Sequence, residues 1–235
     1  MTDKATDQNA LKKAVAAKAL EYVQDGMKLG LGSGSTAEIF LDLLAPRVRG
    51  GLKLLCVPTS ERTAAHARKL GITLSHLDEL APLDLTIDGA DEADRDLNLI
   101  KGGGGMLLRE KIVAASSKSM LVIADESKLV ARLGKFPLPI EVIAFGHKST
   151  AARLQAAFAA LGYADVPMTL RHKDGECFMT DSGCVIYDCA FGQIADAPKL
   201  ATAIQAVPGV VEHGLFIGIA KTLLIASPGE VEVIR

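Results

Sequence analysis

Hydrophobic and polar positions in the first half of the chain alternate between helical and strand-like patterns. Apolar residues spaced three and four apart predict helices over 10–23, 36–44, 60–70 and 106–117. Short apolar runs predict buried strands between these helices, at 27–31, 52–59, 83–88 and 119–125. Strands and helices that alternate at this pace are typical of a mostly parallel α/β sheet with helices on both faces.

The pattern changes after the segment GKFPLP at 134–139. Strand-like and helix-like stretches then follow in the order β-α-β-β-α-β, with one strand interrupted, which is the ferredoxin-like split unit. The tail segments 221–227 and 231–235 are expected to return to the first sheet. We therefore predict one domain over 1–135 and 214–235, and a smaller α+β domain over 136–213.

Composition narrows the class of protein. The chain has 235 residues, of which 49% are hydrophobic and 23% charged, with a formal charge of −2. These values exclude disordered, collagen-like and coiled-coil chains, and they argue against nucleic acid or an anionic membrane as the main partner. The start, MTDKATDQNA, lacks the apolar core of a secretory signal. The four cysteines are thinly spread, which favours reduced thiols in a cytoplasmic protein.

The segment GLGSGST at 30–36 is the first candidate binding motif. It follows a predicted strand and opens a predicted helix, so its free N–H groups and the helix dipole favour a phosphate. Ser35 and Glu38 have the spacing of a capping box. The third glycine comes one residue early for a dinucleotide fingerprint, and the lysine of a P-loop is missing. The predicted ligand is a small phosphate ester, and a tight turn without a ligand is the alternative.

Further polar motifs follow other predicted strands. The carboxylates of DGADEAD at 88–94 indicate either a working site, including a magnesium site, or a solvated acidic turn. The glycines of KGGGG at 101–105 indicate a close approach of the backbone to a ligand or a flexible hinge. A last motif, DESK at 125–128, ends in a lysine that alone would be read as solvated. Because open α/β folds bind ligands at the carboxyl edge of the sheet, we expect all these motifs to converge there.

Together these segments resemble the type A ribose-5-phosphate isomerase family. The matching pieces appear in family order and span nearly the whole chain: GLGSGSTA (30–37), DGADE (88–92), KGGGGMLLREKI (101–112), IADESK (123–128), LGKFPLPIEV (133–142) and PGVVEHGLF (208–216). The resemblance implies a Rossmann-like main domain, a ferredoxin-like smaller domain and a homodimer. It also implies metal-free and cofactor-free interconversion of ribose 5-phosphate and ribulose 5-phosphate, in the non-oxidative pentose phosphate pathway.

The resemblance also assigns roles to residues. Glu110 matches the proton acceptor, and Lys128 matches a further substrate-binding lysine. The remaining matched residues form the ligand-binding turn and the lining of the sugar site: Ser33, Gly34, Ser35, Thr36, Asp88, Gly89, Ala90, Asp91, Lys101, Gly102, Gly103 and Gly104. Ser33 stands where many relatives have threonine, which keeps the hydroxyl. Gly105, Met106 and Leu108 depart from some relatives beside Glu110.

The chemistry of isomerisation agrees with this inventory. After the furanose opens, one carboxylate moves a proton between C2 and C1 through a cis-enediol, and glutamate is ionised at neutral pH. Lys101 and glycine N–H groups are suited to stabilise the charge that develops on the sugar oxygens. Asp88 or Asp91 would shuttle the hydroxyl proton during ring opening. Whether the turn at 33–36 or Lys128 holds the phosphate stays open.

Other activities fit a related fold. A sugar-phosphate deaminase-isomerase would release ammonia, and a CoA transferase would use a glutamate as a nucleophile to form an acyl-CoA adduct. A non-catalytic sugar-phosphate sensor would normally carry a helix-turn-helix. The N-terminal part here predicts only one helix before the first strand.

Overall fold

The structure is a computed structural model that describes residues 2–235. The chain forms two compact units, the first from the residues up to Ala90 with Arg109–Leu129 and Gly218–Arg235, the second from Asp91–Leu108 and Val130–Ile217. These divisions differ from the predicted boundaries after residues 135 and 213. The Glu92 carboxylate, for example, accepts hydrogen bonds from the backbone N–H groups of Gly134 (2.7 Å) and Phe136 (2.6 Å), which ties both segments into the second unit.

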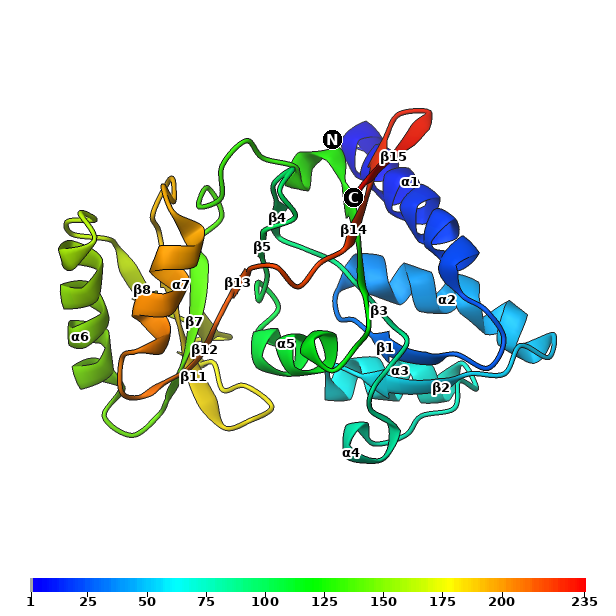
Figure 1. Ribbon diagram of the computed structural model, residues 1–235, viewed down its shortest axis with the longest axis horizontal. Helices are drawn as coiled ribbons and strands as arrows, with labels where there is room; N and C mark the ends of the chain where they lie inside the picture. The colour runs from blue at the N-terminus through cyan, green and yellow to red at the C-terminus, as the bar shows by residue number, and fades with distance from the viewer. Residues whose placement is uncertain (1) are drawn as a thin grey trace. The chain divides into compact units, whose positions relative to one another are not determined.

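The first unit contains a mostly parallel sheet with the strand order β15-β14-β6-β3-β1-β2 (Figure 1). Its strands are β1 (Lys28–Leu31), β2 (Leu55–Pro58), β3 (Leu85–Asp88), β6 (Met120–Asp125), β14 (Thr222–Ser227) and β15 (Glu230–Ile234). Only the hairpin of β14 with β15 is antiparallel among the pairings described for this sheet. As predicted, the tail of the chain returns to this sheet.

Helices cover both faces of this sheet. The helical elements of the first unit are α1 (Thr2–Ala19), η1 (Leu20–Tyr22), α2 (Ser35–Arg49), α3 (Glu61–Lys69), α4 (Leu77–Leu80), α5 (Leu107–Ala115), which starts in the second unit, and η2 (Glu126–Lys128). Leu29 and Leu31 of β1 join the core formed with α1 and α2. Gly30 points to the other face, where a Cβ would lie 2.7 Å from the Val113 side chain of α5. The predicted parallel α/β sheet is confirmed.

The second unit contains the predicted ferredoxin-like arrangement. The chain order β7-α6-β8-β11-α7-β12 folds into an antiparallel sheet with the order β12-β7-β11-β8. Its elements are β7 (Leu138–Ile143), α6 (His147–Ala160), β8 (Met168–Leu170), β11 (Cys184–Cys189), α7 (Ala197–Gln205) and β12 (Val210–His213). Side chains of α6 and α7, such as Phe158 and Ile204, are fully buried in one core with Ile140 of β7.

Two strand-like stretches of this unit are divided into shorter strands. The stretch 168–174 divides at Arg171 into β8 and β9 (His172–Lys173), which pairs with β10 (Glu176–Cys177). The stretch 210–216 divides at Gly214, because β12 pairs with β7 while β13 (Leu215–Phe216) pairs with β5 (Leu99–Ile100). A further short strand, β4 (Glu92–Ala93), completes the small sheet β13-β5-β4. Within residues 2–235, no helix has the length and apolar character that crossing a bilayer requires.

Candidate active site

The polar motifs of the first unit meet where the strand order of its sheet reverses. The chain places β2 on one side of β1 and β3 on the other, so the carboxyl end of β1 is a topological switch point, the usual ligand position in open α/β sheets. There the backbone N–H of Ser33 donates to Asp88 Oδ1 over 3.1 Å, and Gly32 N–H donates to the Ile87 carbonyl over 2.9 Å. The structure therefore brings the glycine turn and the first aspartate together.

Gly32 is required for this approach. A Cβ at this position would lie 2.6 Å from the Asp88 Cα, a backbone atom that has no freedom to move aside. Asp88 itself is fully buried, and Oδ1 also accepts the N–H of Gly89 over 2.7 Å. The two backbone donors fix the orientation of the carboxylate at the end of β3.

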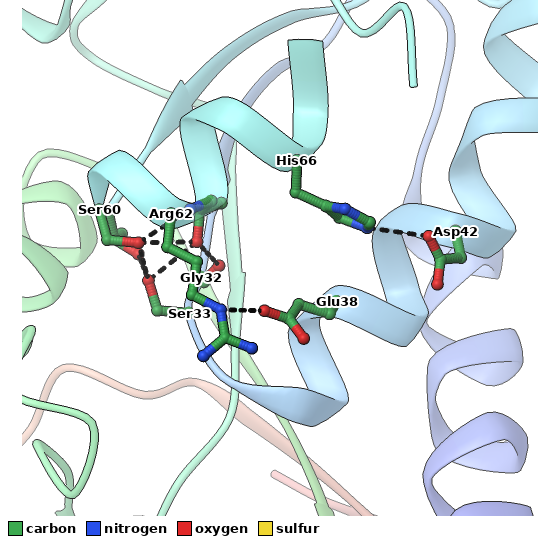
Figure 2. A network of polar contacts seen from close by, with 9 residues as sticks. Gly32, Ser33, Glu38, Asp42, Ser60, Arg62 and His66 are labelled. Carbon is green, nitrogen blue, oxygen red and sulfur yellow. Dashed lines mark hydrogen bonds and ion pairs between the residues drawn. The ribbon is translucent and has the colours of Figure 1, made fainter. Parts of the chain in front are cut away.

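The side chain of Ser33 is engaged inside the protein. Its hydroxyl lies within hydrogen-bond distance of a group of buried hydroxyls, those of Thr59 (2.8 Å), Ser60 (2.9 Å) and Thr63 (3.0 Å). Figure 2 shows Ser33 and Ser60 facing each other across this cluster. Ser60 is the N-cap of α3, so the cluster joins the glycine turn to that helix. Ser33 thus supports the turn through its hydroxyl.

The predicted capping box at Ser35 and Glu38 does not form. Gly34, with φ of 99°, is the N-cap of α2, and Ser35 is the first helical residue. Glu38 pairs instead with Arg62 of α3 over 2.7 Å, beside the bond from His66 to Asp42 (Figure 2). The Ser35 side chain is therefore not used as a cap. Glycine adopts a positive φ at little cost, so Gly34 takes the N-cap position, and it offers no side-chain acceptor to the first N–H groups of α2.

Sequence reasoning missed Lys12, which lies on α1. Its Nζ donates to Ser35 Oγ over 2.9 Å. The N-terminal end of a helix carries a partial positive charge, so a lysine ammonium there is unfavourable by itself. An anion bound beside both would offset this repulsion. The pairing depends on α1 packing along α2, which the helical pattern of residues 10–23 alone does not reveal.

Glu110 is buried on the inner side of α5, with 4% of its surface exposed. It stands one helical turn before Val113, and residues three apart share a helix face. Since Val113 packs against Gly30 of β1, Glu110 lies on the sheet-facing side of α5. The neighbouring Arg109 instead pairs with Glu61 over 2.9 Å.

Lys128 lies near the same sheet edge in the first unit. It ends the short helix η2, which follows β6 directly and is capped by Asp125 through the Ser127 N–H at 3.1 Å. The strand β6 is the neighbour of β3 in the sheet. The Lys128 side chain is half-buried.

Asp91 and the glycine run belong to the second unit. We had expected the glycine run to follow a strand of the parallel sheet, and this prediction is wrong. Lys101 follows β5, which lies in the small antiparallel sheet and not in the parallel one, because β5 pairs with β13 and β4. Two backbone N–H groups of this run are hydrogen-bonded. Lys101 N–H donates to the Gly214 carbonyl (2.9 Å), and Gly103 N–H donates to Asp91 Oδ2 (2.7 Å). Lys101 is 3% exposed, and its ammonium lies 5.6 Å from the centre of the Phe216 ring.

The four cysteines carry free thiols, and those of Cys56 and Cys189 are fully buried. Burial raises the pKa of the Cys56 thiol to about 12 and also raises the pKa of Cys189, so both remain protonated at neutral pH. Among the side chains of residues 8–235, no group of three or more histidine, cysteine, aspartate and glutamate residues is arranged to hold a metal ion.

Comparison with known proteins identifies the family. The sequence model of ribose 5-phosphate isomerase A (phosphoriboisomerase A) matches residues 55–230. The ribose-5-phosphate isomerase A of Nitrobacter hamburgensis is 57% identical over 227 residues, covering 97% of this chain and 98% of the relative. A solved ribose 5-phosphate isomerase from Plasmodium falciparum is 41% identical, with a TM-score of 0.92 over 96% of this chain and 98% of that one.

A third similar protein was solved with a ligand. It is a D-ribose-5-phosphate isomerase in complex with phospho-erythronic acid, 34% identical, with a TM-score of 0.88 over 97% of this chain and 98% of that one. These three relatives are matched over nearly the full length of both chains. The chain belongs to the ribose 5-phosphate isomerase A family.

Proposed function

We propose that this protein interconverts D-ribose 5-phosphate and D-ribulose 5-phosphate through a cis-enediolate, with Glu110 as the base. The observation that carries the proposal is the burial of Glu110 on the sheet-facing side of α5 in the first unit, which also holds the Ser33–Asp88 switch point. A carboxylate shielded from water is suited to take a proton from carbon and return it to the adjacent carbon.

The proton transfers balance as follows in the forward direction. Ring opening moves the proton of the C1 hydroxyl to the ring oxygen, and Asp88 is the carboxylate at the switch point that we propose for this transfer. Glu110 then removes the C2 proton, the C1–C2 double bond forms and the C1 carbonyl becomes an oxyanion. The C2 hydroxyl proton then passes to the C1 oxyanion, which becomes the C1 hydroxyl. As the C2 oxygen becomes the ketone, Glu110 returns its proton to C1.

We place the phosphate at the N-terminus of α2, with Lys12 beside it. Ser35 is exposed, Thr36 is half-buried, and Gly34 leaves the first N–H groups of the helix without a side-chain cap. These donors and the Lys12 ammonium, 2.9 Å from Ser35 Oγ, are the groups that bind a phosphate dianion. Lys128, the alternative holder, is proposed as a second cation for the substrate.

The roles of Asp91, Lys101, Gly102, Gly103 and Gly104 are proposed from the family resemblance, with Gly89 and Ala90 as further sugar contacts. The buried ammonium of Lys101 is the charge we assign to the enediolate oxygens. Phospho-erythronic acid, the ligand of the similar protein described above, joins a phosphate to a short hydroxylated chain and a carboxylate. Those are the two anionic ends that the proposed intermediate would present.

We also propose a cytoplasmic homodimer that needs no cofactor and acts in the non-oxidative pentose phosphate pathway. The near-neutral charge gives no support for a nucleic-acid or membrane partner. Sedimentation of the purified protein would test the dimer, and a particle with the mass of one chain would contradict it.

The activity is tested by adding ribose 5-phosphate to the purified protein and measuring ribulose 5-phosphate. We expect ketose formation and exchange of the C2 proton with solvent deuterium. Absence of both would overturn the proposal. Release of ammonia from an amino-sugar phosphate, or a covalent acyl-CoA adduct, would assign the chain to one of the other enzyme classes considered above.

A further inference from the structure

The glycine run that follows Lys101 accepts hydrogen bonds from a side chain of the ferredoxin-like part of the same unit. Arg171 donates from Nη1 to the carbonyl oxygens of Gly102 over 2.9 Å and Gly103 over 3.3 Å. Arg171 separates β8 from β9, and its own backbone pairs with Ile186 and Phe178. The guanidinium therefore comes from a backbone that is fixed by hydrogen bonds on both sides.

The guanidinium is oriented by a carboxylate of β11. Arg171 donates from Nε to Asp188 Oδ2 over 2.8 Å, and from Nη2 to Asp188 Oδ1. The side chains are 14% and 24% exposed, so the pair is mostly shielded from water. A bidentate pair of this kind fixes the plane of the guanidinium, which leaves Nη1 aimed at the glycine carbonyls.

The hydrogen bonds of Arg171 are linked through the glycine run to Asp91, a proposed substrate-binding residue. The peptide group between Gly102 and Gly103 is bound on both sides: its carbonyl, on Gly102, accepts from Arg171 over 2.9 Å, and its N–H, on Gly103, donates to Asp91 Oδ2 over 2.7 Å. On the other side, Phe178 lies 5.9 Å from the Arg171 guanidinium, and a Cβ on Gly105 would lie 2.5 Å from its ring. A continuous set of contacts thus runs from Asp188 through Arg171 and Gly103 to Asp91.

We infer that Arg171, held by Asp188, is a positioning residue for the isomerase reaction: it sets the path of residues 101–104 and the orientation of Asp91 while acting only through that loop. A glycine run has no side chains to hold its own conformation, so its geometry depends on what binds its carbonyls. Lysine cannot replace arginine here. A single ammonium cannot donate bidentately to the Asp188 carboxylate and also donate to the carbonyls of Gly102 and Gly103.

The inference rests on the proposed function, so the test begins with wild-type isomerase activity on ribose 5-phosphate. If wild type shows none, the proposed function fails, and the remaining measurements no longer bear on catalysis. With activity present, kcat and KM are measured for Arg171→Lys and Asp188→Asn. Arg153→Lys is the matched control, since Arg153 is exposed on α6 and donates to Ser149 over 3.1 Å.

We expect Arg171→Lys to lower kcat about 10- to 100-fold, because small displacements of binding groups have effects of that size. Arg153→Lys should stay within about twofold of wild type. Hydrogen exchange of the amides at 102–105 should accelerate in Arg171→Lys and Asp188→Asn while the thermal midpoint stays close to that of wild type. A purely structural role would lower the thermal midpoint and the amount of active protein, and would leave kcat per active molecule unchanged.

The inference is overturned if Arg171→Lys keeps wild-type kcat and KM, or if kcat falls without faster exchange at 102–105. Should the variants fail to fold, wild-type hydrogen exchange decides the question. If Arg171 and Asp91 hold the loop, the amide of Gly103 exchanges far more slowly than that of Gly175, a glycine in the exposed turn between β9 and β10. Equal exchange at the two glycines would show that the loop is not held.

Discussion

At the scale of single residues, the first unit combines a glycine that nothing else can replace with a carboxylate that its neighbours hold in place. Gly32 leaves room for Asp88, and Asp88 in turn accepts the Ser33 N–H over 3.1 Å. The family resemblance assigned Ser33 to the ligand, whereas its hydroxyl is engaged with Thr59, Ser60 and Thr63. The hydroxyl of Ser33 therefore joins the predicted ligand-binding turn to α3, and its contact with the substrate stays a prediction.

Glu110→Gln should abolish turnover while leaving sugar-phosphate binding nearly intact. Glutamine keeps the shape of the side chain but cannot accept the C2 proton, and loss of a general base costs about 10²–10⁴ in rate. Because one group both removes and returns the proton, we expect the upper end of this range. The measurement is exchange of the C2 proton with deuterium.

Glu61→Gln serves as the control for Glu110→Gln, since Glu61 is a glutamate of the same unit whose side chain is 71% exposed. It should exchange the C2 proton at the wild-type rate. If Glu110→Gln also exchanges at that rate, the base lies elsewhere, and Asp88 or Asp91 becomes the next candidate.

Lys12→Ala should raise KM for ribose 5-phosphate by about 10- to 100-fold with a smaller effect on kcat, in line with about 1.5–3 kcal/mol for a hydrogen bond to a charged group. The neighbouring Lys13→Ala is the matched control, because the Lys13 side chain is exposed. Equal KM values for the two variants would remove Lys12 from the phosphate site. Added salt should weaken wild-type binding more than binding by Lys12→Ala.

At the scale of elements, much of the fold was predictable because its strands are continuous apolar runs. The parallel strands β2, β3 and β6 occupy predicted stretches. β3 and β6 lie inside the sheet and are buried along their whole length, which accounts for their mostly apolar sequences. The β-α-β-β-α-β order of the second unit was equally legible from the alternation of strand-like and helix-like stretches.

What sequence could not supply were pairings between distant short strands. The strand β5 has only two residues, Leu99 and Ile100, and it is defined by pairing with Leu215 and Phe216. No local pattern reveals such a partner, so Lys101 was predicted at the edge of the parallel sheet. Lys12 was missed for a related reason: its contact with Ser35 joins two helices whose packing is a tertiary property.

The Asp84 carboxylate, which directly precedes β3, binds the first residue of β1 and makes the free energy of unfolding depend on pH. Asp84 accepts from Lys118 Nζ over 2.8 Å and from the Lys28 N–H over 2.9 Å. The hydrogen bond from Lys118, followed by that from Lys28, holds the pKa of Asp84 below its ordinary value of 3.8. A lowered pKa in the folded state adds stability above the unfolded pKa, and that stability is lost as pH falls through the folded pKa.

Asp84→Asn should therefore reduce the free energy of unfolding near neutral pH and lose its effect in acid below the pKa of the folded state. The contribution of Lys118 should be small, about 1 kcal/mol or less, because its ammonium is exposed. Denaturant unfolding at a series of pH values measures this. Asp78→Asn, at an exposed carboxylate on α4, is the matched control. A pH-independent difference for Asp84→Asn would contradict the assignment.

At the scale of the whole molecule, activity should survive removal of divalent metal ions. The proposed proton transfers use a carboxylate as the base and a lysine ammonium to stabilise the enediolate, and neither step requires a Lewis acid. We expect dialysis against EDTA to leave kcat and KM unchanged. Complete loss of activity that a divalent ion restores would overturn this expectation.

The path of the chain has a consequence for how such an enzyme can be taken apart. The backbone passes from one compact unit to the other after Ala90, Leu108, Leu129 and Ile217. Neither unit is thus encoded by one uninterrupted stretch of gene, and a single truncation cannot isolate either. To graft the smaller unit of a relative onto this scaffold, two separate coding segments, for 91–108 and 130–217, would have to be exchanged together. Recombination by one crossover is therefore expected to yield chimaeras in which segments of one unit come from different parents.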